Sequence, residues 1–198
     1  MPLPTGFLKS QCCVRLPYPS HKFTDQTIII TGSNVGMGLE AARHFVRLDA
    51  AKVILAVRNL AKGIAAKEDI EASLPERANV VEVWKLDLAN YASTKAFAEK
   101  AQGLERLDVV VCNAGICTYG FRIAEDCEST ITVNVISTFL LALLLVPKLR
   151  ETSVECRKET VLTFTGSFVH AQTAFSERNF DDIFEGLADE KRARMNDR

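Results

Sequence analysis

Apolar stretches alternate with helix-like segments along this chain, and that alternation constrains the fold more than any other feature. The run Ile28-Ile29-Ile30 is β-branched and leads into Thr31-Gly32, a pattern typical of a strand buried on both faces of a parallel sheet. Leu39, Ala42 and Val46 then recur at helical spacing. Further strands are expected at 53–57, 80–88, 107–112 and 160–165, and further helices at 60–74, 91–103 and 125–149. Because strands separated by helices pair in parallel, the sequence predicts a layered α/β domain.

The two ends of the chain depart from this alternation. Residues 1–22 contain four prolines and no periodic pattern, so we expect an irregular arm. Residues 23–198 have the length of one domain with a substantial core, and we expect a single domain there. Within it, residues 176–198 are highly charged and carry a few apolar residues at helical spacing, which indicates a small lobe or loop beside the site.

Composition and charge argue against several classes of function. Hydrophobic residues make up 47% and charged residues 25% of the chain, as in an ordinary globular protein. The net charge of −1 creates no long-range field that would attract nucleic acid or anionic lipid, so we expect neither as a partner. The most apolar stretch, 139–146, is shorter than the roughly 20 residues that cross a bilayer. We therefore expect a buried helix there and no membrane span.

The cysteines and histidines favour a cytoplasmic protein without a metal site. Six cysteines are dispersed along a chain in which we find no secretory segment, so we expect reduced thiols. The three histidines, His21, His44 and His170, are not spaced as partners of any cysteine pair, and we expect no structural metal.

A glycine-rich segment joins the first predicted strand to the first predicted helix, and it reads Thr31-Gly32-Ser33-Asn34-Val35-Gly36-Met37-Gly38. One glycine lets the chain turn, another lets backbone amides approach a pyrophosphate, and a third lets helix and strand pack closely. The helix N-terminus adds unpaired N–H groups and a partial positive charge. The sequence therefore predicts that a dinucleotide binds at Gly32, Ser33, Asn34, Gly36, Met37 and Gly38. The alternative is a glycine-rich turn without a ligand.

The end of the second predicted strand favours NADP over NAD. An acidic residue there would bind the ribose 2′-hydroxyl of NAD and repel a 2′-phosphate. This chain instead has Arg58, and Lys62 follows four residues later. A guanidinium and an ammonium group suit a 2′-phosphate, so we predict NADP as the cofactor. The alternative is that both charges are merely solvated at a helix start.

The glycine segment and Asn113-Ala114-Gly115, after the fourth predicted strand, together resemble the short-chain dehydrogenase/reductase family. Asp87-Leu88 after the third strand, Asn134 in the long helix and Gly166-Ser167-x-x-His170 after the fifth strand extend the resemblance. It covers nearly everything from residue 23 onward. The residues of the glycine segment and of the strand that ends in Arg58 look most like those of the fungal and retinol-dehydrogenase-like branches of this family.

The resemblance implies a Rossmann-like, doubly wound parallel sheet in three α/β/α layers, incomplete at its C-terminal end. It also implies an oxidoreductase that uses NADP to interconvert a small-molecule alcohol and a ketone or aldehyde. Many fungal relatives act on secondary metabolites such as polyketides. In full-length relatives a helix packs beside the segment equivalent to 125–149 in a homodimer, so this face of the helix is expected to be apolar and exposed.

The resemblance also assigns roles to individual residues. Asp87 and Leu88 are expected at the adenine, although Asp87 could instead cap a helix. Asn113, Ala114 and Gly115 are expected to let the cofactor ribose lie close, the alternative being a plain turn.

Two residues are predicted to be catalytic. Ser167 would hydrogen-bond a substrate carbonyl, unless it is only a cap at a strand end. Asn134 would hold a water in the proton relay, unless it is a satisfied buried amide.

The general acid of the family has no counterpart after Ser167. Reduction of a ketone needs a proton donor, which the family supplies as Tyr-x-x-x-Lys, with the Lys lowering the Tyr pKa from about 10. Tyr18 and Lys22 have this spacing but precede the first strand, and Tyr91 and Lys95 follow the third strand at the adenine end. We therefore expect a truncated chain without catalytic competence.

Two hypotheses for the function stay open. The first is an oxidoreductase represented by a truncated chain, and the second is a non-catalytic protein that binds a nucleotide or a partner. A third, an epimerase, is disfavoured by the spacing of the glycines.

Overall fold

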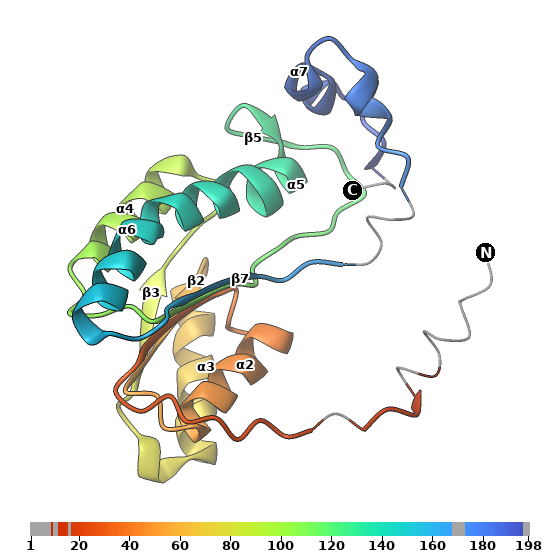
Figure 1. Ribbon diagram of the computed structural model, residues 1–198. Helices are drawn as coiled ribbons and strands as arrows, with labels where there is room; N and C mark the ends of the chain where they lie inside the picture. Colours follow the sequence, from red (N-terminus) through yellow and green to blue (C-terminus); the bar gives the residue numbers. More distant parts are fainter. Residues whose placement is uncertain (1–8, 10–11, 16, 168–172, 196–198) are drawn as a thin grey trace.

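A parallel β-sheet forms the centre of the molecule. The computed structural model describes residues 9, 12–15, 17–167 and 173–195. The sheet order is β3-β2-β1-β4-β7, so the chain steps outward from β1 in one direction and then returns to continue on its other side (Figure 1). The strands are β1 (Thr27–Thr31), β2 (Lys52–Val57), β3 (Val81–Lys85), β4 (Val109–Cys112) and β7 (Val161–Phe164).

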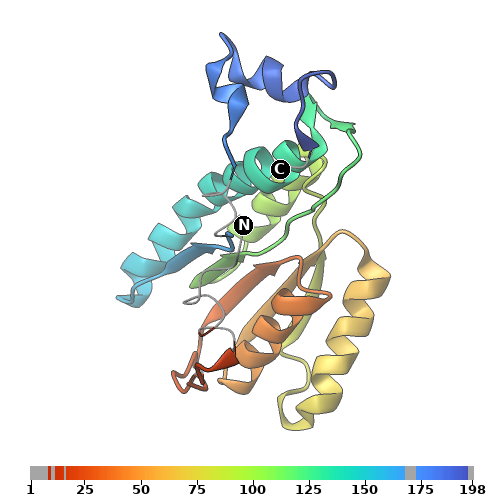
Figure 2. The ribbon, with the colours of Figure 1, turned by 90° about the vertical axis from the view of Figure 1, so that its right-hand side faces the viewer.

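Helices cover both faces of this sheet. In Figures 1 and 2, α2 and α3 lie on one side, and α4 and α6 lie on the other. The helices are α2 (Gly36–Arg47), α3 (Leu60–Ser73), α4 (Tyr91–Gln102) and α6 (Thr138–Cys156). Alternate residues of β1 face the two layers: Ile28 and Ile30 pack with α2 and α3, whereas Ile29 packs with α4 and α6. The predicted three-layer, Rossmann-like α/β fold is therefore confirmed.

The first strand is buried as its sequence predicts. Ile28, Ile29 and Ile30 have no exposed surface, and Ile29 lies opposite Ile54 of β2 and Val110 of β4. Burying three such side chains contributes roughly 5–9 kcal/mol of hydrophobic free energy before conformational entropy is subtracted. This strand therefore anchors the glycine segment that follows it.

The prediction of one helix over 125–149 is wrong at both ends. Residues up to Glu128 instead form a short antiparallel hairpin of β5 (Ile123–Ala124) and β6 (Cys127–Glu128). The Glu128 carboxylate then accepts the Thr130 N–H, which starts the short helix α5 (Ser129–Ile131). A π-helical segment (Thr132–Ser137) joins α5 to α6. Helix α6 runs on to Cys156 with Pro147 inside it, on the exposed face.

The third strand is shorter than the predicted 80–88, because residues 86–88 leave the sheet at its carboxyl edge. Leu86 still donates its N–H to the Val57 carbonyl at 2.9 Å, but Asp87 and Leu88 bend away. The residues lost from the strand line the cavity described below.

The continuous helical stretch Ser129–Cys156 is long and apolar enough to cross a membrane, and its most apolar window of 18 residues has a mean hydropathy of 2.1. It exceeds the run 139–146 on which the sequence-based expectation rested. Half of its most apolar window is buried within the molecule, where the helix packs on α4 and the sheet. A core helix meets the same criteria of length and composition, and this packing is compatible with one.

The end segments pack on the central unit. Residues 18–23 of the arm lie along α2, where the Arg47 guanidinium stacks 3.8 Å from the Tyr18 ring centroid. Beyond β7, the 3-10 turn Ser176–Asn179 and α7 (Ile183–Ala188) form a lobe that stands clear of the sheet and contacts β6 (Figure 2).

Candidate functional site

A cavity of about 390 Å³ opens at the carboxyl ends of the strands, where the chain order reverses around β1. Open α/β sheets bind their ligands at such a switch point. Segments that follow β1, β2, β3 and β4 contribute to its wall. Its lining includes the predicted residues Gly32, Asn34, Gly36, Met37, Arg58, Asp87, Leu88, Asn113, Ala114 and Gly115. Sequence reasoning missed further lining residues, namely Val35, Ala56, Leu86, Ala89, Ile116 and Val133.

Helix α2 presents its N-terminus to this cavity without a side-chain cap. Its N-cap residue, Val35, has no side chain that could accept the first N–H groups. By contrast, Asn59 caps α3 and Asn90 caps α4. A helix N-terminus left open in this way binds anions through its N–H groups and its dipole. Gly36, the first residue of α2, has φ +60°, and a Cβ there would meet no atom within 4 Å, so space remains for a ligand.

The other two glycines of the segment hold the loop against the sheet. A Cβ on Gly32 would lie 2.8 Å from the Ala114 Cα, and one on Gly38 would lie 2.6 Å from the Gly32 carbonyl oxygen. Neither position can accept a side chain without a shift of backbone. The three glycines thus divide their tasks as a dinucleotide site requires, and the loop fits the pyrophosphate of such a cofactor.

Two predicted residues, Ser33 of this segment and Asn113 after β4, support the segment by hydrogen bonds to the end of β1. Ser33 is fully buried, and its hydroxyl donates to the Ile30 carbonyl at 2.8 Å. Asn113 uses its side-chain amide to donate to the Thr31 carbonyl at 3.1 Å. Ser33 and Asn113 therefore fix the end of β1, and Asn113 also lines the cavity.

The two cations predicted to select NADP line two different hollows. Arg58 is exposed and lines the cavity. Lys62 lines a neighbouring hollow of about 420 Å³ between α2 and α3, with Asn34, Val35 and Asp69 among its neighbours. Arg58 precedes α3 and Lys62 lies in its first turn, and only Arg58 lines the cavity, so Arg58 is the better placed of the two for a group bound there.

Asp87 lines the cavity, as its predicted role at the adenine requires, but it does not cap α4. Its carboxylate accepts the Ala89 N–H at 3.0 Å, which makes a local turn, and the residue also lines the cavity beside Leu88. The cap of α4 itself is Asn90, whose side chain accepts the Ser93 N–H at 2.7 Å.

Asn134 binds the loop that leaves β4. Its side-chain oxygen accepts the Ile116 N–H and its amide donates to the Ile116 carbonyl, both at 2.8 Å. The alternative interpretation supposed a buried amide, but Asn134 is exposed. It lies in the π-helical segment, a geometry frequent at functional sites. Gly115 faces it, since a Cβ there would lie 3.3 Å from the Asn134 side-chain oxygen.

Ser167 is exposed in the segment that follows β7. Neither Ser167 nor Asn134 belongs to the lining of the cavity, although Ser167 follows β7 and Asn134 bonds to the loop that follows β4. His170 lies outside the described residues.

Tyr91, the first residue of α4, has surroundings that do not favour its action as a general acid. Burial, together with the nearby Cys127 and the acidic Asp126 and Glu125, raises the pKa of Tyr91 above its usual value, against a weaker opposing hydrogen bond from Thr132. A Tyr that donates a proton near neutral pH requires the opposite shift.

Comparisons with known proteins agree with this geometry. The family model for short chain dehydrogenase matches residues 26–160. A short chain dehydrogenase/reductase of Cryptosporiopsis sp. is 51% identical over 178 residues, covering 89% of this chain and 55% of its own length. A short chain dehydrogenase of Emericella nidulans is 51% identical over 186 residues, covering 93% of this chain and 59% of its own. The chain thus spans somewhat more than half the length of these relatives.

Solved structures show the same fold. A short chain dehydrogenase from Escherichia coli complexed with NADPH superposes with a TM-score of 0.62 at 29% identity, covering 78% of this chain and 64% of the other. One from Shigella flexneri complexed with NADP gives 0.62 at 28% identity, covering 78% and 64%. On the family model and these relatives together, the chain belongs to the short-chain dehydrogenase family of oxidoreductases.

Proposed function

We propose that this chain forms the NADP-binding part of an oxidoreductase that interconverts a small-molecule alcohol and a ketone or aldehyde. The observation that carries the proposal is that the uncapped N-terminus of α2 and the guanidinium-bearing Arg58 line the same cavity. The first suits a pyrophosphate and the second suits a ribose 2′-phosphate. At the end of β2 no carboxylate takes the place of Arg58 to repel that phosphate.

The residues of the site divide into two ends. Backbone N–H groups of residues 36–38 would hold the diphosphate, and Arg58, Asp87 and Leu88 would surround the adenosine. Gly115 and the Ile116 loop, which Asn134 fixes, would border the nicotinamide. When bound, the cofactor supplies or accepts a hydride. Ser167 would hydrogen-bond the substrate oxygen and stabilise its developing charge.

The relatives support the wider assignment. The NADPH and NADP complexes of the bacterial neighbours support NADP as the cofactor here. The curated relatives at 51% identity come from fungi, and on this likeness we propose a substrate from fungal secondary metabolism. The six dispersed cysteines, read as reduced thiols, are the ground on which we propose a cytoplasmic location. The alternative of a non-catalytic binding protein gains no support from these matches.

The cofactor assignment is tested by binding. NADPH and NADH are titrated against the wild-type chain and Arg58→Ala, with the increase in nicotinamide fluorescence as the readout. Loss of one guanidinium–phosphate pair should weaken NADPH binding on the order of tenfold to a hundredfold and leave NADH binding within about twofold. Unchanged NADPH affinity in Arg58→Ala would remove the role of this side chain.

Turnover is tested separately. The 198-residue polypeptide contains three tyrosines, and two of them, Tyr18 and Tyr91, are placed on the arm and at the start of α4. We expect it to bind NADPH but not to oxidise it with carbonyl substrates. Oxidation of NADPH at a rate that Ser167→Ala abolishes would show that this polypeptide is catalytically competent.

A further inference from the structure

Three cations surround the turn between β2 and α3. Arg58 and Lys62 belong to the turn and the first turn of α3, and Lys85 is the last residue of the neighbouring strand β3. Within the part of the chain that the structure describes, none of these three forms an ion pair with a carboxylate. Three positive charges without a carboxylate partner at one turn favour the binding of an anionic ligand there.

Lys85 contacts the backbone of Arg58. Its ammonium donates to the Arg58 carbonyl oxygen at 2.5 Å. The parallel register sets Lys85 opposite Val57, so the Lys85 side chain needs to reach only one residue beyond the end of β2. Lys85 does not line the cavity, and its effect on a ligand there would act through Arg58.

The remainder of this turn is held on both sides. Leu86 donates its N–H to the Val57 carbonyl at 2.9 Å, and Asn59 accepts the Lys62 N–H at 3.1 Å. Helix α3 lies so close that a Cβ on Gly63 would be 2.5 Å from Val83. Between these fixed points the Lys85 bond restrains the carbonyl group of Arg58, the residue that carries the guanidinium.

A second lysine of the strand pair β2 and β3, Lys52, provides a comparison for Lys85. Lys52, the first residue of β2, forms an ion pair with Glu82 of β3 at 2.8 Å. Among the residues that the structure describes, Lys85 has no such acidic partner and bonds to the carbonyl of the cavity-lining Arg58 instead. No described carboxylate therefore neutralises its charge in an ion pair.

We propose that Lys85 is a positioning residue that determines the preference for a 2′-phosphorylated adenosine. It holds the Arg58 peptide so that the guanidinium faces the phosphate, and it adds an un-neutralised positive charge behind it. This inference rests on the proposed NADP site and extends it to a residue 27 positions away in the sequence.

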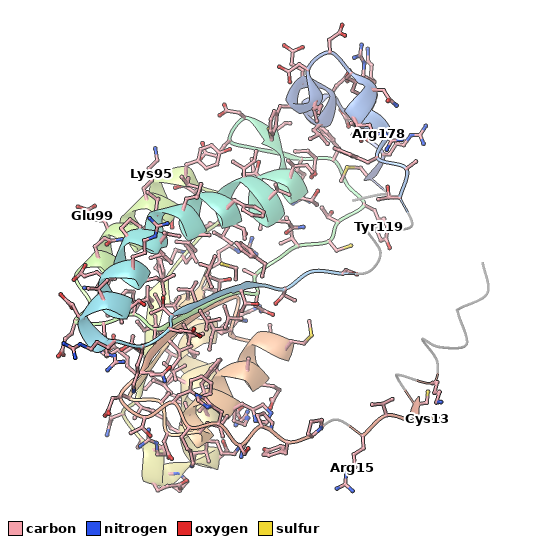
Figure 3. The ribbon with its side chains drawn as sticks, viewed as in Figure 1. Cys13, Arg15, Lys95, Glu99, Tyr119 and Arg178 are labelled. Carbon is pink, nitrogen blue, oxygen red and sulfur yellow. The ribbon has the colours of Figure 1, made fainter. Side chains whose placement is uncertain are left out.

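The test uses nucleotide fragments, so that binding is read without turnover. Adenosine 2′,5′-bisphosphate and adenosine 5′-monophosphate are titrated by calorimetry into the wild-type chain, Lys85→Met, Lys85→Arg and Arg58→Ala. The control is Lys95→Met, which removes an exposed lysine from α4, on the opposite layer of the sheet (Figure 3). Melting curves verify that each variant is folded, and Lys85→Gln replaces Lys85→Met if the latter is not.

Lys85→Met should weaken binding of the bisphosphate roughly fivefold to tenfold and leave the monophosphate within about twofold. Lys85→Arg, which keeps a charged donor, should recover most of this loss, and Lys95→Met should match the wild type. If Lys85→Met binds both fragments as the wild type does, or weakens both equally, the inference is overturned while a selective loss in Arg58→Ala still supports the proposed function. If the wild type does not distinguish the two fragments, the proposed function fails and the inference fails with it.

Discussion

The hydroxyl of Thr31 and the backbone of Asn113 join the carboxyl ends of β1 and β4. Thr31 Oγ1 accepts the N–H of Asn113 at 3.0 Å and the N–H of Ala114 at 2.9 Å. The Asn113 side chain returns a bond to the Thr31 carbonyl at 3.1 Å. Because β4 stops pairing at Cys112, the Ala114 N–H depends on this side chain for its partner, whereas the Asn113 N–H also donates to the Val111 carbonyl at 3.0 Å. The pair therefore fixes the two loops that enclose the cavity.

Thr31→Val should destabilise the protein and weaken its cofactor binding. Valine has almost the same shape but leaves the partly buried Ala114 N–H unsatisfied, at a cost of about 1–3 kcal/mol in the free energy of unfolding. NADPH affinity should fall roughly tenfold because both loops lose their mutual restraint. Urea unfolding and fluorescence titration measure the two effects. Thr31→Ser retains the hydroxyl and should stay close to the wild type; an equal loss in both variants would contradict the role of the hydroxyl.

Much of the fold and the phosphate loop could be predicted from the sequence. The apolar run at 28–30 and the glycines that follow it carry local physical requirements, burial and backbone freedom, that do not depend on distant residues. The direction of side chains beyond a strand end could not be predicted in this way. Arg58 and Lys62 are close in sequence, yet the change from strand to helix sends them to different hollows.

Contacts that depend on the register of the strands could not be predicted from the sequence either. Lys85 reaches Arg58 only because Val57 lies opposite it in the sheet. The hairpin at 123–128 escaped prediction because its pairs are two residues long, and Glu125 adopts a left-handed φ of 56° without a glycine to signal the turn. The π-helical segment at 132–137 has apolar spacing that an α-helix would equally satisfy.

Asn134→Ala should loosen the loop that follows Gly115. The substitution removes both bonds to the Ile116 backbone, so the Ile116 amide should exchange hydrogen roughly tenfold faster, corresponding to the loss of about one net hydrogen bond. Hydrogen–deuterium exchange with peptide resolution over 113–122 measures this. Val135→Ala, at the neighbouring exposed position, is the control and should leave this exchange unchanged. Equal protection in Asn134→Ala and wild type would show that the loop is held by other contacts.

An apolar surface on α6 and β7 should drive self-association. The Phe139 and Phe164 rings stack at 4.8 Å yet remain 51% and 40% exposed, and Leu143 beside them is 70% exposed. Leu143→Lys should lower the association seen by light scattering at high protein concentration while changing stability by no more than about 0.5 kcal/mol. Ile64→Lys, the same change at an exposed position of α3 on the other layer, should leave association unaltered. If Leu143→Lys associates as the wild type does, this face is not responsible.

Stability should decline in alkaline solution because of Cys112. This thiol is buried at the end of β4, and burial raises its pKa from 9.0 to about 11. Between these values the unfolded chain has lost the proton that the folded protein still holds, so raising the pH favours unfolding. At 1.36 kcal/mol for each pKa unit, the free energy of unfolding should fall by up to about 2–3 kcal/mol as the pH approaches 11.

Urea unfolding of the wild type and Cys112→Ala at pH 8, 9 and 10 isolates the contribution of the Cys112 thiol, since all other titrating groups are shared. The difference in stability between the two proteins should shrink as the pH rises; a difference that stays constant would show that the thiol keeps an ordinary pKa.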